Sequence, residues 1–174
     1  VKQSHSMEYA ACNVYLIDGS KEITISTRPM VIVCPGGAYS YTSDREAEIV
    51  ALQFLAMGYH ASVLRYSTAP AVFPTSALEL GCAVLQIRRH AAEWNINPDQ
   101  LVVTGFSAGG HLAASYCMFW NQKWMAKDLN TENELLRPNG MVLGYPVITS
   151  GEYAHTGSFQ NLLGAEYEAK KDIF

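Results

Sequence analysis

The sequence predicts an α/β protein with a mostly parallel sheet and helices on both faces. Short apolar runs that are typical of buried strands recur along its 174 residues. Between them lie segments whose apolar residues recur every three or four positions, as in amphipathic helices. This alternation indicates parallel strands joined by helical crossovers. No linker, repeat or low-complexity tract interrupts the order, so residues 1–174 are interpreted as a single domain.

The first segments are interpreted as strands. Residues 11–18 and 23–26 alternate in polarity and are predicted to be outer strands joined by a turn near Gly19. Residues 30–34 are apolar throughout, which predicts a central strand. Ser43 then opens the sequence Ser-Asp-Arg-Glu, which is typical of a capping box at the start of a helix.

Two amphipathic helices and a strand follow. The first helix is predicted to end at Gly58, and its apolar residues share one face: Ala47, Val50, Ala51, Phe54 and Leu55. Residues 62–66 are predicted to be the next strand. The second helix is predicted to begin at Pro74, since proline suits a first helical position. Its apolar stripe consists of Ala77, Leu80, Val84, Ile87 and Ala91.

The strand predicted at residues 101–104 runs directly into Gly-Phe-Ser-Ala-Gly and then into a helix that reaches about residue 120. Gly-x-Ser-x-Gly between a strand and a helix is typical of a nucleophile elbow. A serine nucleophile must project from a very tight turn, and residues two positions away must be small because strand and helix nearly touch. Ser107 is therefore the predicted catalytic residue. The alternative is a chance turn rich in glycine and serine.

Residues 121–137 are predicted to be polar and irregular, and residues 141–144 to be another short strand.

A second motif follows the strand at residues 30–34. The sequence Pro-Gly-Gly-Ala-Tyr lets the backbone approach a substrate closely enough to donate hydrogen bonds. An acyl-transfer enzyme must stabilise the negative charge that develops on the carbonyl oxygen, and backbone N–H groups do so without reorganising. The predicted oxyanion-hole donors are the N–H groups of Gly37, Ala38 and Ala108. By itself, Pro-Gly-Gly is also typical of an ordinary turn.

From residue 30 to residue 164 the chain resembles the α/β-hydrolase esterase and lipase family, in particular its hormone-sensitive-lipase-like and acetyl-xylan-esterase-like branches. The loop at residues 35–39 is similar to the His-Gly-Gly-Gly-Trp motif, with Pro35 in place of histidine. Residues 97–112 are similar over their whole length. Residues 144–148 and 155–164 look most like the bacterial sugar-ester deacetylases.

The resemblance also implies residues that this chain does not carry. Such enzymes have the serine, an acid and a histidine in that chain order, and the family places the last two beyond the position of Phe174. We therefore interpret the chain as the N-terminal portion of the fold, with the C-terminal strands missing, and expect it to be inactive by itself. The strand at residues 141–144 would then be an apolar edge that pairs with a second copy or with a C-terminal fragment.

The remaining polar candidates are assigned smaller roles. His111 is predicted to bond beneath the elbow, and His155 to serve the substrate side or the structure rather than a catalytic triad. Asp44 and Asp99 are interpreted as capping and turn residues. No histidine or cysteine spacing is typical of a metal site, so no metal or other cofactor is expected. The tryptophans are predicted to pack in the core or a lid: Trp94, Trp120 and Trp124.

The composition excludes several classes of partner. A net charge of −4 gives no attraction to nucleic acid or to an anionic membrane. No apolar run reaches the roughly 18 residues of a membrane span. The four cysteines, scattered through the chain, are interpreted as mostly buried free thiols, which favours a reducing cytoplasm: Cys12, Cys34, Cys82 and Cys117. A secreted protein whose signal was removed is the alternative.

The resemblance implies a serine carboxylesterase that acts on small acyl esters, with acetyl esters of sugars or other small alcohols as its substrates. Two alternatives stay open. Aryl formamidases resemble the chain through a Gly-Gly-x-Trp-like loop and the sequence Ser-Ala-Gly-Gly-His-Leu. The chain could instead be a non-catalytic interaction module, because it lacks the acid and histidine of the triad.

Overall fold

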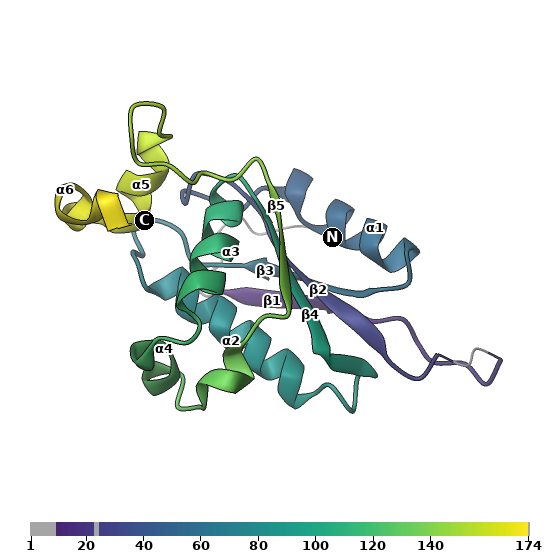
Figure 1. Cartoon of the computed structure of the whole chain (residues 1–174). Coiled ribbons are helices and arrows are strands. Elements are labelled where there is room, and N and C mark those ends of the chain that lie inside the picture. The colour runs from purple at the N-terminus through teal and green to yellow at the C-terminus, as the bar shows by residue number, and fades with distance from the viewer. Residues whose placement is uncertain (1–9, 23–24, 174) are drawn as a thin grey trace.

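A five-stranded sheet forms the centre of the computed structural model, which describes residues 10–22 and 25–173 (Figure 1). The order of the strands is β1-β3-β2-β4-β5. Strands β2 to β5 are parallel to one another, and β1 is antiparallel to β3. The strands are β1 (Ala11–Tyr15), β2 (Arg28–Cys34), β3 (His60–Arg65), β4 (Ile96–Phe106) and β5 (Gly140–Gly144).

Helices cover both faces of this sheet, as the alternation of the sequence predicts. Helix α1 (Glu48–Ala56) lies on one face, and α2 (Thr75–Arg89) and α3 (Ala108–Phe119) lie on the other (Figure 1). Side chains of β2 alternate between the two layers because successive residues of a strand point to opposite sides. Met30 and Ile32 belong to the core that α2 and α3 cover. Val31 and Val33 belong to the core beneath α1.

Short helices complete the chain around the ends of the strands. The remaining α-helices are α4 (Lys123–Asp128), α5 (Thr156–Leu163) and α6 (Tyr167–Lys170). The short 3-10 helices are η1 (Asp44–Glu46), η2 (Asn133–Leu136), η3 (Gly164–Glu166) and η4 (Lys171–Ile173). Helix α5 adds Leu162 and Leu163 to the core on the side of α2 and α3, so the segment after β5 returns to the body of the protein.

The predicted pairing of the two outer strands is wrong. Strand β1 pairs with β3, with Ala11 opposite Arg65 and Tyr15 opposite Ala61. Ile25 and Ser26 are not in a strand, and residues 23 and 24 lie outside the described part. Antiparallel pairing with β3 satisfies the backbone groups along one edge of the parallel sheet, an advantage that the local polarity pattern cannot reveal.

The prediction that residues 121–137 are irregular is also wrong, because α4 and η2 lie in this segment. Met125 and Leu136 are fully buried, and the Tyr116 hydroxyl donates a hydrogen bond to the Leu136 carbonyl. These two apolar side chains anchor a polar segment to the core. They are too far apart in the sequence to produce a helical periodicity.

Strand β4 is longer than the sequence predicts. It begins at Ile96 and includes Asp99, which was expected to be a turn residue. Its pairing with β2 shifts register between Arg28 and Met30, so the polar residues near Asp99 lie at an irregularity of the ladder. The Asn97 side chain accepts a hydrogen bond from the Asp99 N–H at 3.0 Å, which explains why the segment looks like a turn in sequence.

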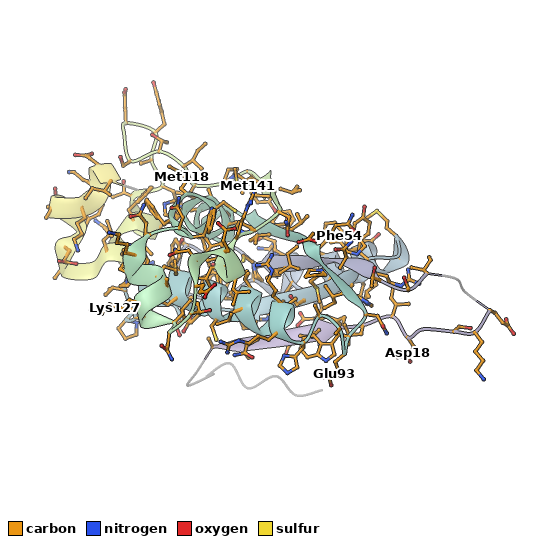
Figure 2. All side chains as sticks on the ribbon, turned by 60° about the horizontal axis from the view of Figure 1, so that its bottom comes forward. Asp18, Phe54, Glu93, Met118, Lys127 and Met141 are labelled. Carbon is orange, nitrogen blue, oxygen red and sulfur yellow. The ribbon has the colours of Figure 1, made fainter. Side chains whose placement is uncertain are left out.

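At the opposite edge of the described sheet, β5 lies outermost, beside β4. Met141 on β5 is 49% exposed, and Met118 on α3 is 70% exposed (Figure 2). The described residues thus present apolar side chains along this edge, as the sequence predicts. Pairing of this edge with another chain stays a prediction.

Candidate active site

Ser107 lies on the turn that joins β4 to α3. Its backbone angles, φ 51° and ψ −120°, are in a region that costs a non-glycine residue about 1–3 kcal/mol. Two backbone hydrogen bonds hold the turn: Ser107 N–H donates to the Gly144 carbonyl, and Val147 N–H donates to the Ser107 carbonyl, each at 3.1 Å. The strain and its anchors place the serine at the carboxyl end of a central parallel strand.

The glycines on either side of Ser107 are required by close contacts between backbones. A Cβ atom on Gly105 would collide with the Gly109 carbonyl, and one on Gly109 would collide with the carbonyls of Cys34 and Pro35. Strand β4, helix α3 and the end of β2 therefore touch each other through backbone atoms. The prediction that both positions must be small is confirmed.

The loop after β2 lies against this turn. A Cβ atom on Gly36 would lie 2.9 Å from the Ser107 Cβ atom, so loop and serine are in direct proximity. Gly37, Ala38 and Tyr39 all have positive φ, at 134°, 56° and 56°. Among the described residues, nothing accepts a hydrogen bond from the N–H groups of Gly37, Ala38 or Ala108. The structure thus brings the four predicted site residues to one end of the sheet, and their catalytic roles stay predictions.

Two side chains that were not predicted to belong to the site hold this loop. The Glu46 carboxylate accepts a hydrogen bond from the Gly36 N–H at 2.7 Å, and the Asn161 amide donates one to the Ala38 carbonyl at 2.9 Å. The predicted capping box is wrong, because Ser43 makes no side-chain cap and α1 begins after Ala47. Glu46 is directed instead toward the loop, where its carboxylate accepts the Gly36 N–H. No local pattern marks Asn161.

Asp44 also differs from its predicted capping role. Its carboxylate forms an ion pair with Arg65 at 2.9 Å, and Glu48 reaches the same guanidinium at 2.6 Å. Arg65 is buried and also donates to the Thr42 carbonyl at 3.1 Å. The segment between the loop and α1 is therefore fixed to the end of β3, which supports the position of Glu46.

His111 lies beneath the turn on α3, and its side chain is buried. Its Nδ1 atom forms a hydrogen bond with the Tyr39 hydroxyl at 2.8 Å, and its ring meets Phe159 edge-on at 5.3 Å between centroids. Burial lowers the pKa of His111 to about 4 and raises that of Tyr39 well above its usual value. At neutral pH, an uncharged imidazole and an uncharged phenol therefore link the loop to α3.

The low pKa of His111 makes stability depend on pH. Between about pH 6.5, the usual pKa of histidine, and pH 4, the unfolded chain binds a proton that the folded chain does not. The free energy of unfolding therefore falls as the pH falls through this window, by up to about 3 kcal/mol from this group, and the full contribution is present above pH 6.5.

We expect His111→Gln to remove about 2–3 kcal/mol from the difference in unfolding free energy between pH 7.5 and pH 4.5. Urea unfolding of the full-length gene product at both pH values measures that difference. His90→Gln, which changes a partly exposed histidine at the end of α2, is the matched control. The same acid-induced loss in wild type and His111→Gln would contradict the assignment.

The other aromatic and histidine candidates take part in packing. His155 bonds the Ser158 hydroxyl at 2.8 Å at the start of α5. Trp94 stacks on His90 with 4.7 Å between ring centroids, and Trp124 meets Phe73 edge-on at 5.8 Å. With Trp120, both tryptophans pack against the core, as the sequence predicts.

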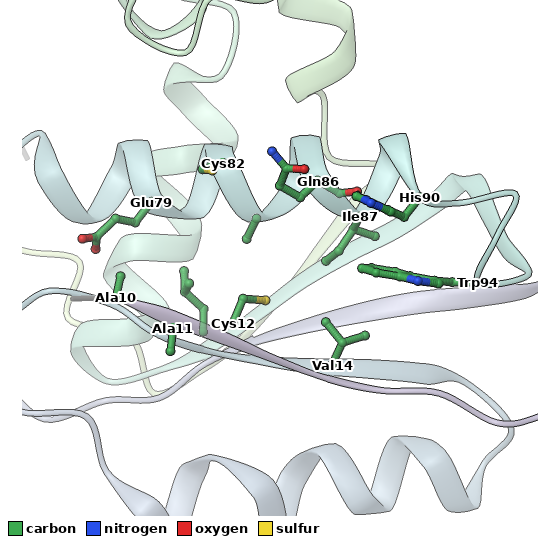
Figure 3. A pocket seen from close by; sticks show the side chains of 12 residues that line it. Ala10, Ala11, Cys12, Val14, Glu79, Cys82, Gln86, Ile87, His90 and Trp94 are labelled. Atoms are coloured by element: carbon green, nitrogen blue, oxygen red, sulfur yellow. The ribbon is translucent and has the colours of Figure 1, made fainter. Parts of the chain in front are cut away.

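A cavity of about 410 Å³ lies between β1 and α2, away from these residues (Figure 3). Its lining is mainly apolar and includes Cys12, Val14, Ile87 and Trp94, but none of the predicted site residues.

The described cysteines are free thiols, yet Cys12 and Cys82 are exposed and only Cys34 is fully buried. The expectation of mostly buried thiols is wrong, because β1 and α2 leave this cavity open between them.

The described residues hold neither a metal-binding cluster nor a helix that could span a membrane. Within residues 10–22 and 25–173, no three His, Cys, Asp or Glu side chains cluster as they would around a metal ion. In the same part of the chain, no helix has the length and apolar character that crossing a membrane requires.

A mostly parallel sheet with helices on both faces, and a strained serine between a central strand and its helix, define the class of α/β hydrolases. The family model BD-FAE matches residues 14–170. The chain belongs to the BD-FAE family.

Three relatives show what this chain is similar to. The endo-1,4-beta-xylanase B of Butyrivibrio fibrisolvens is 37% identical over an alignment of 144 residues that covers 79% of this chain and 22% of that enzyme. The acetylxylan esterase of Xylanibacter ruminicola is 31% identical over an alignment of 140 residues that covers 78% of this chain and 26% of that enzyme. The solved structure of an acetyl ester-xyloside bifunctional hydrolase from Caldicellulosiruptor lactoaceticus is 36% identical with a TM-score of 0.74, and the match covers 88% of this chain and 54% of that one.

The chain thus spans about a quarter of the length of these two curated enzymes and about half of the solved one.

Proposed function

We propose that the full-length gene product is a serine carboxylesterase that hydrolyses small acyl esters, above all acetyl esters of sugars or other small alcohols. The observation that carries the proposal is the proximity of Ser107, on its strained turn, to a loop in which the Gly37 and Ala38 N–H groups donate to no described residue. The names of the acetylxylan esterase and the acetyl ester-xyloside hydrolase support the substrate class.

In this mechanism the Ser107 hydroxyl oxygen attacks the ester carbonyl and loses its proton to a general base. The N–H groups of Gly37, Ala38 and Ala108 stabilise the oxyanion of the tetrahedral intermediate. The alcohol leaves with a proton, and water then hydrolyses the acyl-serine by the same steps in reverse. We do not assign the base to His111, which is buried and bonded to Tyr39, or to His155, which is bonded to Ser158.

We expect the full-length gene product to hydrolyse p-nitrophenyl acetate with a kcat/KM at least about tenfold above that for p-nitrophenyl octanoate, since each added methylene changes transition-state binding by about 1–3 kcal/mol in a pocket of fixed size. Initial rates on acetate, butyrate and octanoate esters, and acetate release from acetylated xylan, measure the preference. Faster turnover of octanoate would contradict the small-acyl claim.

The same assay, extended to N-formyl-arylamines, separates the alternative functions. Activity on N-formyl-arylamines without activity on esters would identify an amide hydrolase. No hydrolysis of any substrate, with intact folding, would favour an interaction module.

A further inference from the structure

We propose that Glu46 and Asn161 are positioning residues that fix the geometry of the oxyanion loop from its two ends. The loop here means residues 36–39, and the inference rests on the proposed esterase function. Neither side chain is assigned to contact the substrate. Each is expected to act on the rate of acyl transfer through the backbone groups that it holds.

The loop needs external anchors because its own conformation is unfavourable. Three successive residues have positive φ, and two of them, Ala38 and Tyr39, carry side chains. Such conformations cost about 1–3 kcal/mol each and persist only where surrounding contacts determine them. From the residues that directly follow the loop, Ser40 N–H donates to the Gly37 carbonyl at 2.9 Å and Ser43 N–H donates to the Gly36 carbonyl at 2.8 Å. These bonds hold the carbonyls of the two peptide groups that carry the Gly37 and Ala38 N–H groups, and because a peptide group is planar they set the local direction of both predicted donors. The donating residues belong to the same turn, so the position of the loop relative to Ser107 depends on contacts with other elements.

Glu46 holds the first end of the loop. Its Oε2 atom accepts the Gly36 N–H at 2.7 Å, and its Oε1 atom accepts the Tyr145 hydroxyl at 3.0 Å. Tyr145 directly follows β5 and packs against Phe106 at 5.7 Å between ring centroids. Since β4 lies between β2 and β5, one carboxylate connects the ends of the two strands that flank the serine turn.

Asn161 holds the second end from helix α5. Its side-chain amide donates to the Ala38 carbonyl at 2.9 Å. Phe159 on the same helix packs against His111, which in turn bonds Tyr39. Helix α5 therefore fixes the loop through the direct hydrogen bond from Asn161 and supports it through the packing of Phe159 against His111.

The two anchors bracket the predicted donors. Glu46 binds the peptide group between residues 35 and 36, and Asn161 binds the one between residues 38 and 39. The N–H groups of Gly37 and Ala38 belong to the two peptide groups in between. Fixing the loop at both ends limits how far these inner peptide groups can move relative to Ser107. A preorganised donor stabilises the transition state because no reorganisation is needed when the charge develops.

The test compares variants at both anchors in the full-length gene product. We expect Glu46→Ala and Asn161→Ala each to lower kcat on p-nitrophenyl acetate by about 10–100-fold with KM within about threefold, less than the 10²–10³-fold cost of deleting an oxyanion-hole donor. Glu46→Gln should stay within about threefold of wild type, because its amide oxygen still accepts the Gly36 N–H. Glu93→Ala and Gln160→Ala change exposed side chains of matched size and serve as controls.

A second readout reports on the loop itself. Phenylboronic acid forms a tetrahedral anionic adduct with a serine oxygen and so resembles the intermediate. Its inhibition constant should rise in Glu46→Ala and Asn161→Ala by a factor similar to the fall in kcat. If the two side chains only stabilised the fold, the variants would have a lower melting temperature, but the rise in inhibition constant would not match the fall in kcat.

The outcomes separate this inference from the function on which it rests. A wild-type protein without esterase activity would overturn both. An active wild type with both alanine variants within twofold in kcat, or with changes confined to KM, would overturn the positioning role alone. Circular dichroism checks folding, and if Glu46→Ala does not fold, Asn161→Ala decides by the same criteria.

Discussion

Ser107→Ala is expected to lower kcat/KM on p-nitrophenyl acetate by about 10⁴-fold or more. The proposed mechanism has no other nucleophile. Catalytic residues that act as a unit are non-additive, so removing any one of them removes most of the rate acceleration. The residual rate would come from oxyanion donors and substrate binding, which in a related triad system retain about 10³–10⁴-fold over water. Folding should be unaffected, because alanine keeps the Cβ atom that lies against Gly36.

Initial-rate kinetics and labelling by a fluorophosphonate probe measure this loss in the full-length gene product. Ser115→Ala, on the same helix α3, is the matched control and should keep both activity and labelling. Activity of Ser107→Ala within tenfold of wild type would show that another residue is the nucleophile.

The parts of the site that the sequence predicted are those whose causes are local. The turn at Ser107 needs small residues at Gly105 and Gly109 because their backbones touch neighbouring backbones. The whole motif spans five adjacent residues, so the sequence alone reveals it. The loop at Gly36 and Gly37 is similarly marked by its own residues. Strand and helix alternation likewise predicted the layers, since each element buries a face that its own periodicity defines.

The parts that were missed depend on partners distant in the chain. Ala38 and Asn161 are 123 positions apart, yet share a hydrogen bond. Ser43 and Glu46 match a local capping pattern, but the Gly36 N–H takes the carboxylate instead. The pairing of β1 with β3 was missed for the same reason. The hydrogen bonds between two strands distant in the chain produce no pattern in the sequence of either strand.

Gly109→Ala is expected to destabilise the protein by about 2 kcal/mol or more. An added Cβ atom would collide with the carbonyls of Cys34 and Pro35, and overpacking typically costs about 1–3 kcal/mol where side chains can yield. Backbone carbonyls at the end of a central strand cannot yield in that way, so the cost should exceed the gain of about 1 kcal/mol in helix propensity.

Gly19→Ala is the matched control for this prediction. A Cβ atom at Gly19 would meet nothing within 4 Å, so its substitution should change stability by about 1 kcal/mol at most, in the stabilising direction. Melting temperatures of the full-length gene product should fall by about 5 °C in Gly109→Ala and stay near wild type in Gly19→Ala. Esterase activity should fall in Gly109→Ala at temperatures where it is still folded, because the collision separates the loop at residues 36–39 from the turn that carries Ser107. Equal melting temperatures for the two variants would mean that helix α3 does not need its close contact with the end of β2.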